Sequence, residues 1–216
     1  MATNKFIPAL RFKWLTPLYD FLIGIPMPEQ KIKQVLVETA DVSPAAKLLD
    51  FGCGTATLTV LAKQVQPGAE VTGIDIDTEI LNKAIQKIKD KKLVIALANY
   101  DGKQLPFERN SFDRIISCLV FHHLDTDTKQ KALAEIFRVL KTGGQLHIAD
   151  FGRSDSWTQR LLFNIIRGLD GFKSTDANAK GLFPRLISDA GFENRVIKNK
   201  FRTIFGEVQI ISAAKI

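Results

Sequence analysis

The chain has 216 residues, of which 45% are hydrophobic and 25% charged, and a formal net charge of +7. This length suits one domain, and the composition is that of a globular protein rather than a disordered or fibrous one. No apolar run approaches the roughly 20 residues that a membrane-spanning helix needs, which excludes an integral membrane protein at the level of sequence.

The N-terminal segment does not fit a signal peptide, because Pro8, Arg11 and Lys13 break it up. Cys53 and Cys118 are too few for a disulfide framework or a zinc site. We expect both to be small apolar residues in a reducing compartment, so the protein is predicted to be cytoplasmic. The positive charge is compatible with an anionic partner or a weak contact with a membrane surface, but an ordinary basic surface explains it as well.

Residues 1 to 30 are rich in large apolar side chains, and four prolines cut them into short pieces. We predict a lid of short helical pieces over the core, with simple packing against the sheet edge as the alternative. Apolar residues at a spacing of 3.6 then predict a helix over residues 28 to 40. Residues 1 to 40 are therefore the predicted lid and first helix.

The next hundred residues alternate between apolar runs and amphipathic segments. The predicted strands cover residues 46–51, 71–77, 93–98, 112–117 and 145–150, and the predicted helices cover 55–65, 78–89 and 129–140. Short connections in such a series indicate a parallel sheet with helices on both faces, and ligands bind such sheets at the carboxyl ends of the strands.

The pattern changes after residue 150. Apolar spacing predicts a helix from Trp157 to Ile166, a loop over 168–176, and a helix over 182–190 that Gly191 ends. Two alternating runs, 192–200 and 202–213, predict an antiparallel hairpin. The expected fold is therefore α/β, doubly wound and Rossmann-like, with a mostly parallel seven-stranded sheet, a C-terminal antiparallel hairpin and an N-terminal helical lid.

The segment from Leu48 to Leu58 combines the end of a strand, a turn with two glycines and the start of a helix. Gly52 and Gly54 permit positive φ and close approach of a ligand, and the amides that open the next helix can face it. A dinucleotide fingerprint would need glycine where Thr57 stands, so a dehydrogenase is disfavoured. An ordinary strand-to-helix turn remains the structural alternative.

Asp75 lies 21 residues after Gly54, at the end of the second predicted strand. A carboxylate there can accept hydrogen bonds from both hydroxyls of a ribose. Its alternative role is to cap the following helix, for which Asp77 is better placed. Asp75 therefore predicts a bound nucleoside without identifying it.

Four motifs together resemble the class I S-adenosylmethionine-dependent methyltransferases over residues 45 to 150. Asp50, Gly52, Gly54 and Ala56 match the family's first motif. The other three matches are Asp101 with Leu105-Pro106-Phe107 and Ser111-Phe112-Asp113, then His122-His123-Leu124, and Leu140-Lys141-Thr142-Gly143-Gly144 with threonine in place of the family's proline. Tyr19-Asp20 resembles an element of the quinone-biosynthesis methyltransferases.

The resemblance implies S-adenosylmethionine as the cofactor. The residues implied to bind it are Tyr19, Asp50, Gly52, Gly54, Asp75, Ile76, Asp101, Gly102 and Ser117. The two glycines would pass the amino-acid end, with Ser117 beside it, while Asp75 would hold the ribose and Asp101 the adenine. Asp113 is expected to be structural. The chain is then a single methyltransferase domain, with a cofactor-binding core at 45–150 and substrate-side elements at 151–216.

His122 is the candidate general base, with shaping of the pocket floor as its alternative, and His123 is the weaker candidate. Two adjacent histidines point differently and no third ligand is spaced for a metal, so none is expected. Asp150 and Arg153 lie on the predicted substrate side, where a salt bridge or a helix cap explains them as well. No dedicated catalytic acid is required.

Aromatic residues in the lid, with Trp157, Phe163 and Phe172, suit a flat or apolar acceptor. We expect O- or C-methylation of a small molecule, with a quinone-like compound as one candidate, by a monomer or homodimer. One alternative is an RNA methyltransferase that uses Arg195, Lys198, Lys200 and Arg202, although no Asn-Pro-Pro-Tyr-type amine site is present and nucleic acid is disfavoured. Another is a non-catalytic protein that binds a nucleoside.

Overall fold

The computed structural model describes residues 28–152, 181–203 and 206–216, which include most of the predicted elements. The helices are α2 (Glu29–Ala40), α3 (Thr57–Val65), α4 (Thr78–Asp90), the short 3₁₀ helix η2 (Phe121–His123), α5 (Thr126–Val139) and α8 (Phe183–Asp189). The strands are β1 (Lys47–Phe51), β2 (Glu70–Asp75), β3 (Ala96–Asn99), β4 (Phe112–Cys118), β5 (Leu140–Gly152), β6 (Glu193–Thr203) and β7 (Gly206–Ala214). The predicted lid and the segment from Arg153 to Lys180 lie outside the described residues.

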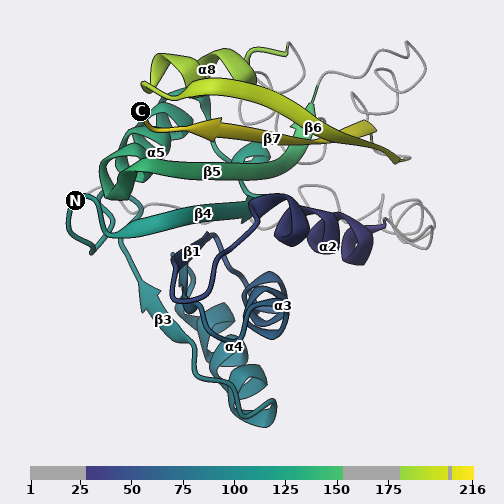
Figure 1. Ribbon diagram of the computed structural model, residues 1–216, viewed down its shortest axis with the longest axis vertical. Helices are drawn as coiled ribbons and strands as arrows, with labels where there is room; N and C mark the ends of the chain where they lie inside the picture. Colours follow the sequence, from purple (N-terminus) through teal and green to yellow (C-terminus); the bar gives the residue numbers. More distant parts are fainter. Residues whose placement is uncertain (1–27, 153–180, 204–205) are drawn as a thin grey trace, which may run out of the picture.

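The strands form one seven-stranded sheet in the order β3-β2-β1-β4-β5-β7-β6 (Figure 1). The pairs between β3 and β5 in this order are parallel, while β7 runs antiparallel to both β5 and β6. The predicted fold class is therefore confirmed, including the C-terminal hairpin. β1 and β4 lie in the middle of the sheet, so their carboxyl ends are near the centre of the edge at which the parallel strands end.

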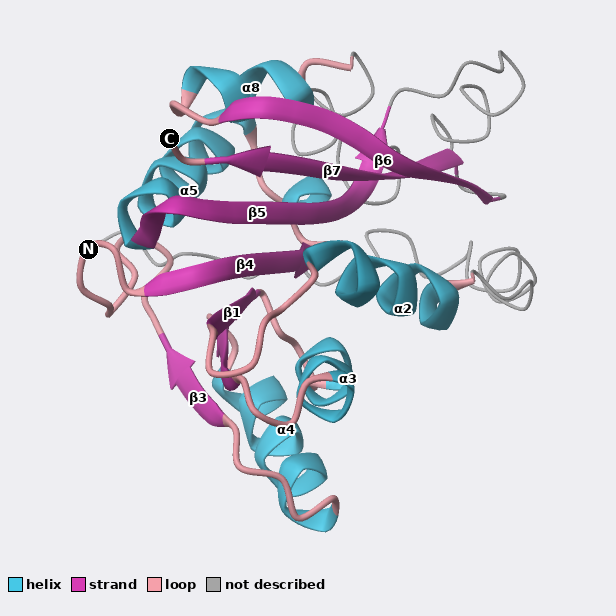
Figure 2. Ribbon diagram, in the orientation of Figure 1, coloured by secondary structure: helices cyan, strands magenta, loops and turns pink. Residues whose placement is uncertain are grey.

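Helices cover both faces of the sheet, as the alternation of strands and helices requires (Figure 2). α2 and α3 pack on one face, where Leu36 and Leu58 share a buried cluster with Leu48. α5 and α8 pack on the other face, where Leu133 and Ile187 share a cluster that includes Leu49. Neighbouring leucines of β1 thus enter opposite cores, which explains why this strand is apolar at successive positions.

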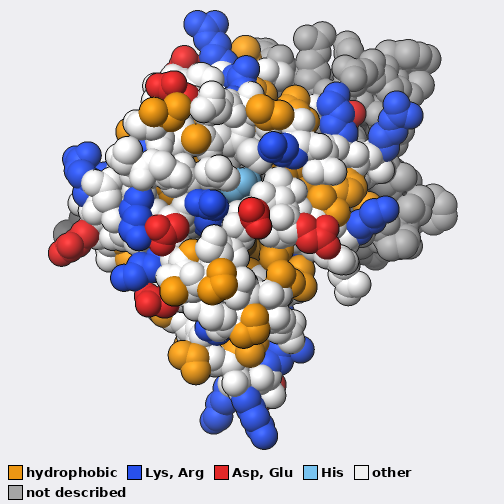
Figure 3. Space-filling view, in the orientation of Figure 1, with side chains coloured by type: hydrophobic (Ala, Val, Ile, Leu, Met, Phe, Trp, Pro, Cys, Tyr) orange, Lys and Arg blue, Asp and Glu red, His pale blue; other side chains and the backbone are white. Residues whose placement is uncertain are grey.

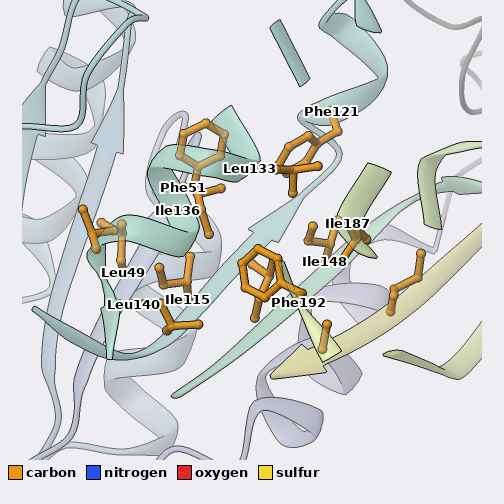
Figure 4. Packing of buried hydrophobic residues seen from close by; sticks show 14 of the residues in the cluster. Leu49, Phe51, Ile115, Phe121, Leu133, Ile136, Leu140, Ile148, Ile187 and Phe192 are labelled. Atoms are coloured by element: carbon orange, nitrogen blue, oxygen red, sulfur yellow. The ribbon is translucent and has the colours of Figure 1, made fainter. Parts of the chain in front are cut away.

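Aromatic side chains, among them Phe51, Phe121 and Phe192, lie among aliphatic ones in the core under α5 and α8 (Figure 4). Phe121 is fully buried, with its ring centroid 5.7 Å from that of Phe51 and 5.0 Å from that of Phe183. Burial of a phenyl ring contributes about 2–3 kcal/mol, so it anchors the short helix η2 to the sheet. The residues on either side of Phe121 are thereby fixed at the carboxyl end of β4.

Several predicted boundaries are wrong by a few residues. α5 begins at Thr126 rather than at residue 129, because the side chain of Asp125 accepts the N–H of Thr128 at 2.8 Å and caps the helix. β5 begins at Leu140 rather than at residue 145. The predicted Gly143-Gly144 turn lies inside that strand, where the pairing register between β4 and β5 shifts and Gly143 has a φ of 79°.

Along the described ranges, every helix is either too short or too polar to cross a lipid bilayer.

Candidate functional site

A hollow of about 270 Å³ lies at the carboxyl ends of β1 and β4. It is lined by Glu29, Lys33, Asp50, Gly52, Cys53, Gly54, Thr55, Thr57, Leu58, Cys118, Leu119 and Val120. This edge hollow therefore contains the predicted glycine turn. A second hollow, of about 440 Å³, lies among the amino ends of the strands beside Lys47, Glu70 and Phe112, and no predicted site residue lines it.

The backbone of the glycine turn has three positive φ angles, 73° at Gly52, 53° at Gly54 and 60° at Ala56. A Cβ on Gly52 would lie 2.5 Å from Cγ2 of Val120, so the turn is pressed against the loop after β4. A Cβ on Gly54 would meet no atom within 4 Å, which leaves room above this residue for a ligand. Ala56 gives α3 no side-chain cap, so the first amides of α3 have none of the usual capping partners.

Asp75 lies next to this turn, at the end of β2 as predicted. Its Oδ2 accepts the N–H of Gly54 at 2.8 Å, and its Oδ1 accepts the N–H of Asp77 at 3.0 Å. Each carboxylate oxygen has a second lone pair, so both can still accept a hydroxyl from a ligand. Asp77 caps α4 by accepting the N–H groups of Glu79 and Ile80, which confirms its predicted capping role, while ribose binding by Asp75 stays a prediction.

Ile76 and Asp101 follow the ends of β2 and β3 and lie beside this part of the site. The side chain of Ile76 is 60% exposed, and a Cβ on Gly102 would lie 3.9 Å from its Cγ2. Asp101 is exposed, and the backbone N–H of Lys103, 2.9 Å from Oδ1, holds the pKa of this carboxyl below its usual range. An exposed apolar side chain near a carboxylate suits a flat ring with a hydrogen-bond donor at its edge.

Asp50 and Ser117 are buried near the carboxyl ends of β1 and β4. Asp50 is 1% exposed, accepts the hydroxyl of Thr59 at 2.6 Å and forms part of the hollow's floor. Burial raises the pKa of Asp50 to about 7. Ser117 is fully buried, and its hydroxyl donates to the carbonyl oxygen of Phe51 at 2.9 Å. The structure thus gives both side chains a part in fixing the end of β1.

His122 is hydrogen-bonded to Asp150, which lies 28 residues later in the chain. Nδ1 of His122 lies 3.0 Å from Oδ1 of Asp150, which also accepts the N–H of Phe151 at 2.7 Å, while Oδ2 accepts the N–H of Phe121 at 2.8 Å. Burial by itself would raise the pKa of Asp150, but His122 and the backbone donors outweigh it and hold this pKa below its usual range.

In the tautomer that carries its proton on Nδ1, His122 donates to this carboxylate, and Nε2 is then the acceptor of the ring. The ring of His123 lies against that of His122, with centroids 3.9 Å apart, and burial lowers the pKa of His123 to about 4. The contact that the structure shows for Asp150 is thus a buried hydrogen bond with His122, while Arg153 lies outside the described residues.

Asp113 is structural, as expected, because it accepts the N–H of Lys47 at 2.8 Å and contacts Nζ of Lys141 at 2.7 Å. Tyr19 lies outside the described residues. Across residues 28–152, 181–203 and 206–216, no group of three or more His, Cys, Asp or Glu side chains is arranged to hold a metal ion. Sequence reasoning missed Glu29 and Lys33, because an acid and a lysine four residues apart on a helix are typical of an ordinary surface pair.

Residues 48–144 match the family model described as a methyltransferase domain. The ubiquinone/menaquinone biosynthesis C-methyltransferase UbiE of Bordetella avium is 36% identical over 122 residues, which are 56% of this chain and 47% of UbiE, so the chain spans about half the length of that relative. An uncharacterized methyltransferase of Synechocystis sp. is 28% identical over 99% of this chain and 97% of its own. A crystal structure of an S-adenosylmethionine-dependent methyltransferase from Aquifex aeolicus superposes with a TM-score of 0.65 at 17% identity, and the match covers 90% of this chain and 97% of that one.

Proposed function

Because the chain belongs to the class I S-adenosylmethionine-dependent methyltransferases, we propose that it transfers a methyl group to a small aromatic or apolar acceptor. The observation that carries the proposal is the contact between Gly54 and Asp75, which joins the open glycine turn to the end of the neighbouring strand. The similarity to the C-methyltransferase UbiE favours C-methylation of a quinone-like compound, with O-methylation as the alternative. We place the protein in the cytoplasm, as a monomer or homodimer and a single domain over residues 1–216.

In this proposal the cofactor lies along the carboxyl edge of β1, β2 and β3. Gly52 and Gly54 lie alongside the amino-acid end of the cofactor. Asp75 accepts hydrogen bonds from the ribose hydroxyls, and Asp101 accepts one from the adenine amino group. Ile76 and Gly102 flank the ring. Asp50, which lines the hollow, and Ser117 lie beside the amino-acid end, and Tyr19 contributes from the predicted lid. The room above Gly54 and the uncapped start of α3 support this arrangement.

S-adenosylmethionine supplies a methyl group activated by a positively charged sulfur. The residues of this chain have to hold that group and the acceptor in line, and such positioning can contribute on the order of 7–11 kcal/mol. The carboxylate of Asp75 beside the glycine turn favours a cationic ligand. His122 removes the proton of the acceptor through Nε2, while Asp150 holds Nδ1 and thereby orients the ring.

Charge distribution favours a small acceptor over RNA. Nη1 of Arg195 lies 3.2 Å from Oγ of Ser188, and Nζ of Lys200 lies 3.2 Å from Oε1 of Glu207. Two of the four cations that the RNA alternative needs therefore already have partners within the chain. Figure 3 shows Lys and Arg side chains spread over this face, with a group at the lower tip where α4 ends. A dispersed pattern of this kind does not form the continuous basic stripe that a nucleic-acid backbone requires.

Calorimetry with S-adenosylhomocysteine and with NAD is the first test. We expect the homocysteine derivative to bind and NAD not to bind, and binding of NAD alone would reverse the choice of ligand. A methyl-transfer screen over phenols, quinols and small amines then separates an enzyme from a non-catalytic binder. Methylation of RNA, with binding that falls steeply as salt increases, would instead support the RNA alternative.

Asp75→Ala is expected to weaken binding of S-adenosylhomocysteine by about 1–3 kcal/mol, roughly 5- to 150-fold, because the ribose loses its acceptor and Gly54 loses its partner. Calorimetry measures the change directly. Asp77→Ala is the matched control, since the Asp77 side chain caps α4, whereas that of Asp75 accepts the N–H of Gly54 in the glycine turn. The control should lower stability by about 1 kcal/mol and leave affinity unchanged. Equal affinities for Asp75→Ala and the wild type would remove the assigned role.

A further inference from the structure

Two charged side chains of α2 line the edge hollow, although α2 precedes the glycine turn by more than ten residues. Glu29 and Lys33 are one helical turn apart, and Nζ of Lys33 lies 2.5 Å from Oε1 of Glu29. The side chain of Lys33 is 15% exposed and that of Glu29 is 50% exposed. The lysine therefore lies mostly within the structure, in contrast to the ordinary surface pair of this spacing.

Packing fixes α2 against the sheet. Ile32 and Leu36 are fully buried in the cluster that includes Leu48 of β1. Because successive turns of a helix present the same face, Glu29 and Lys33 are held side by side at the hollow by this packing. Lys31, by contrast, is exposed and does not line the hollow.

Glu29 and Lys33 place one negative and one positive charge at this end of the hollow, and these can pair with the two opposite charges of a zwitterion. In the free protein the ammonium group of Lys33 and the carboxylate of Glu29 neutralise each other. A ligand that carries both a carboxylate and an ammonium group can exchange partners with the pair and leave no charge without one. Charge-assisted hydrogen bonds of this kind are about twice as strong as neutral ones.

We propose that Glu29 and Lys33 form a clamp for the zwitterionic amino-acid end of the methyl donor, with Lys33 on the carboxylate and Glu29 on the ammonium group. The clamp rests on the proposed function and deepens it. It assigns the end of the ligand next to the glycine turn to a helix outside the segment of the chain that matches the family model. The same pair selects a ligand that carries the amino-acid group over a nucleoside that lacks it.

Two probes that differ only at this end test the clamp. S-adenosylhomocysteine carries the amino-acid group, and 5′-methylthioadenosine lacks it. Calorimetry should show Lys33→Met binding S-adenosylhomocysteine at least about tenfold more weakly than the wild type, with 5′-methylthioadenosine unchanged within about twofold. Lys31→Met, on the same helix, should leave both affinities unchanged. Glu29→Gln provides a second, isosteric variant with the same expected selectivity.

A third probe, the decarboxylated form of S-adenosylhomocysteine, separates the two halves of the clamp. Its affinity should be unchanged in Lys33→Met and reduced in Glu29→Gln. Equal weakening of all three probes by Lys33→Met, or no weakening of any, would overturn the clamp. A wild-type protein that binds none of the probes would instead contradict the proposed function, so the two failures are distinguishable.

Discussion

Asp150→Ala is expected to lower the free energy of unfolding by about 3–5 kcal/mol, because it removes the carboxylate that accepts hydrogen bonds from several buried donors. The N–H groups of Phe121 and Phe151 and Nδ1 of His122 all bond to this carboxylate, which is 2% exposed. A buried donor left without an acceptor costs about 1–3 kcal/mol. Three such donors left together should therefore destabilise the protein more than most single substitutions do.

Urea unfolding at neutral pH measures this change, and Asp113→Ala is the matched control. Asp113 also accepts two hydrogen bonds, but its side chain is 33% exposed, so its removal should cost about 1 kcal/mol or less. At acidic pH, the difference in the free energy of unfolding between Asp150→Ala and the wild type should become smaller. A pKa held below its usual range gives stability that is present at neutral pH and is lost as the pH falls through the folded-state value. Similar losses in the two alanine variants would show that the buried network is not strongly coupled.

In contrast to Asp150→Ala, Asp50→Asn is expected to raise the free energy of unfolding relative to the wild type at about pH 7 and above. Burial raises the pKa of Asp50 from its ordinary value of 3.8 to about 7. The folded state therefore holds a proton that the unfolded state has released, so stability is full below about pH 4 and falls as the pH rises to about 7. One pKa unit corresponds to about 1.4 kcal/mol, and the wild type should lose up to about 4 kcal/mol across this window.

Asparagine is uncharged, and its amide oxygen can still accept the hydroxyl of Thr59 that Asp50 accepts. The free energy of unfolding of Asp50→Asn, followed by urea titration from pH 4 to pH 8, should accordingly lack this downward slope. Asp113→Asn should retain the slope, because the pKa of Asp113 is lowered and its carboxylate is ionised throughout the window. A slope in Asp50→Asn as steep as that of the wild type would assign the pH dependence to another group.

The central strands of the fold were predictable, and the reasons for the misses are local. β3 begins at Ala96 rather than at residue 93, since Val94 is apolar and yet 84% exposed, so hydrophobicity there does not report burial. The start of α5 was missed because the polar residues before Lys129 resemble a loop, while Asp125 in fact caps them into the helix. The glycine pair at 143 and 144 looks like a turn in the sequence, but it accommodates an irregularity inside β5.

The site divides in the same way between local and distant contacts. A motif of consecutive residues specifies its own backbone, so the glycine turn and the acid after β2 were located from sequence and lie at one edge of the sheet. The pairing of His122 with Asp150 and the approach of α2 to the hollow join residues far apart in the chain. Their spacing in sequence contains no signal for contact, because only the packing of helices on the sheet brings them together.

The place of β7 between β5 and β6 imposes an order on assembly during synthesis. β6 precedes β7 in the chain, yet among the described strands it pairs with β7 alone. While a ribosome is still adding β7, β6 therefore has no neighbour to dock on, and the last parallel strand, β5, presents a bare edge. Val196 and Ile197 of β6, 48% and 42% exposed even in the finished sheet, are then wholly unprotected. Insertion of one strand between two others is thus a late, non-local step, and the nascent chain is most prone to aggregate just before it.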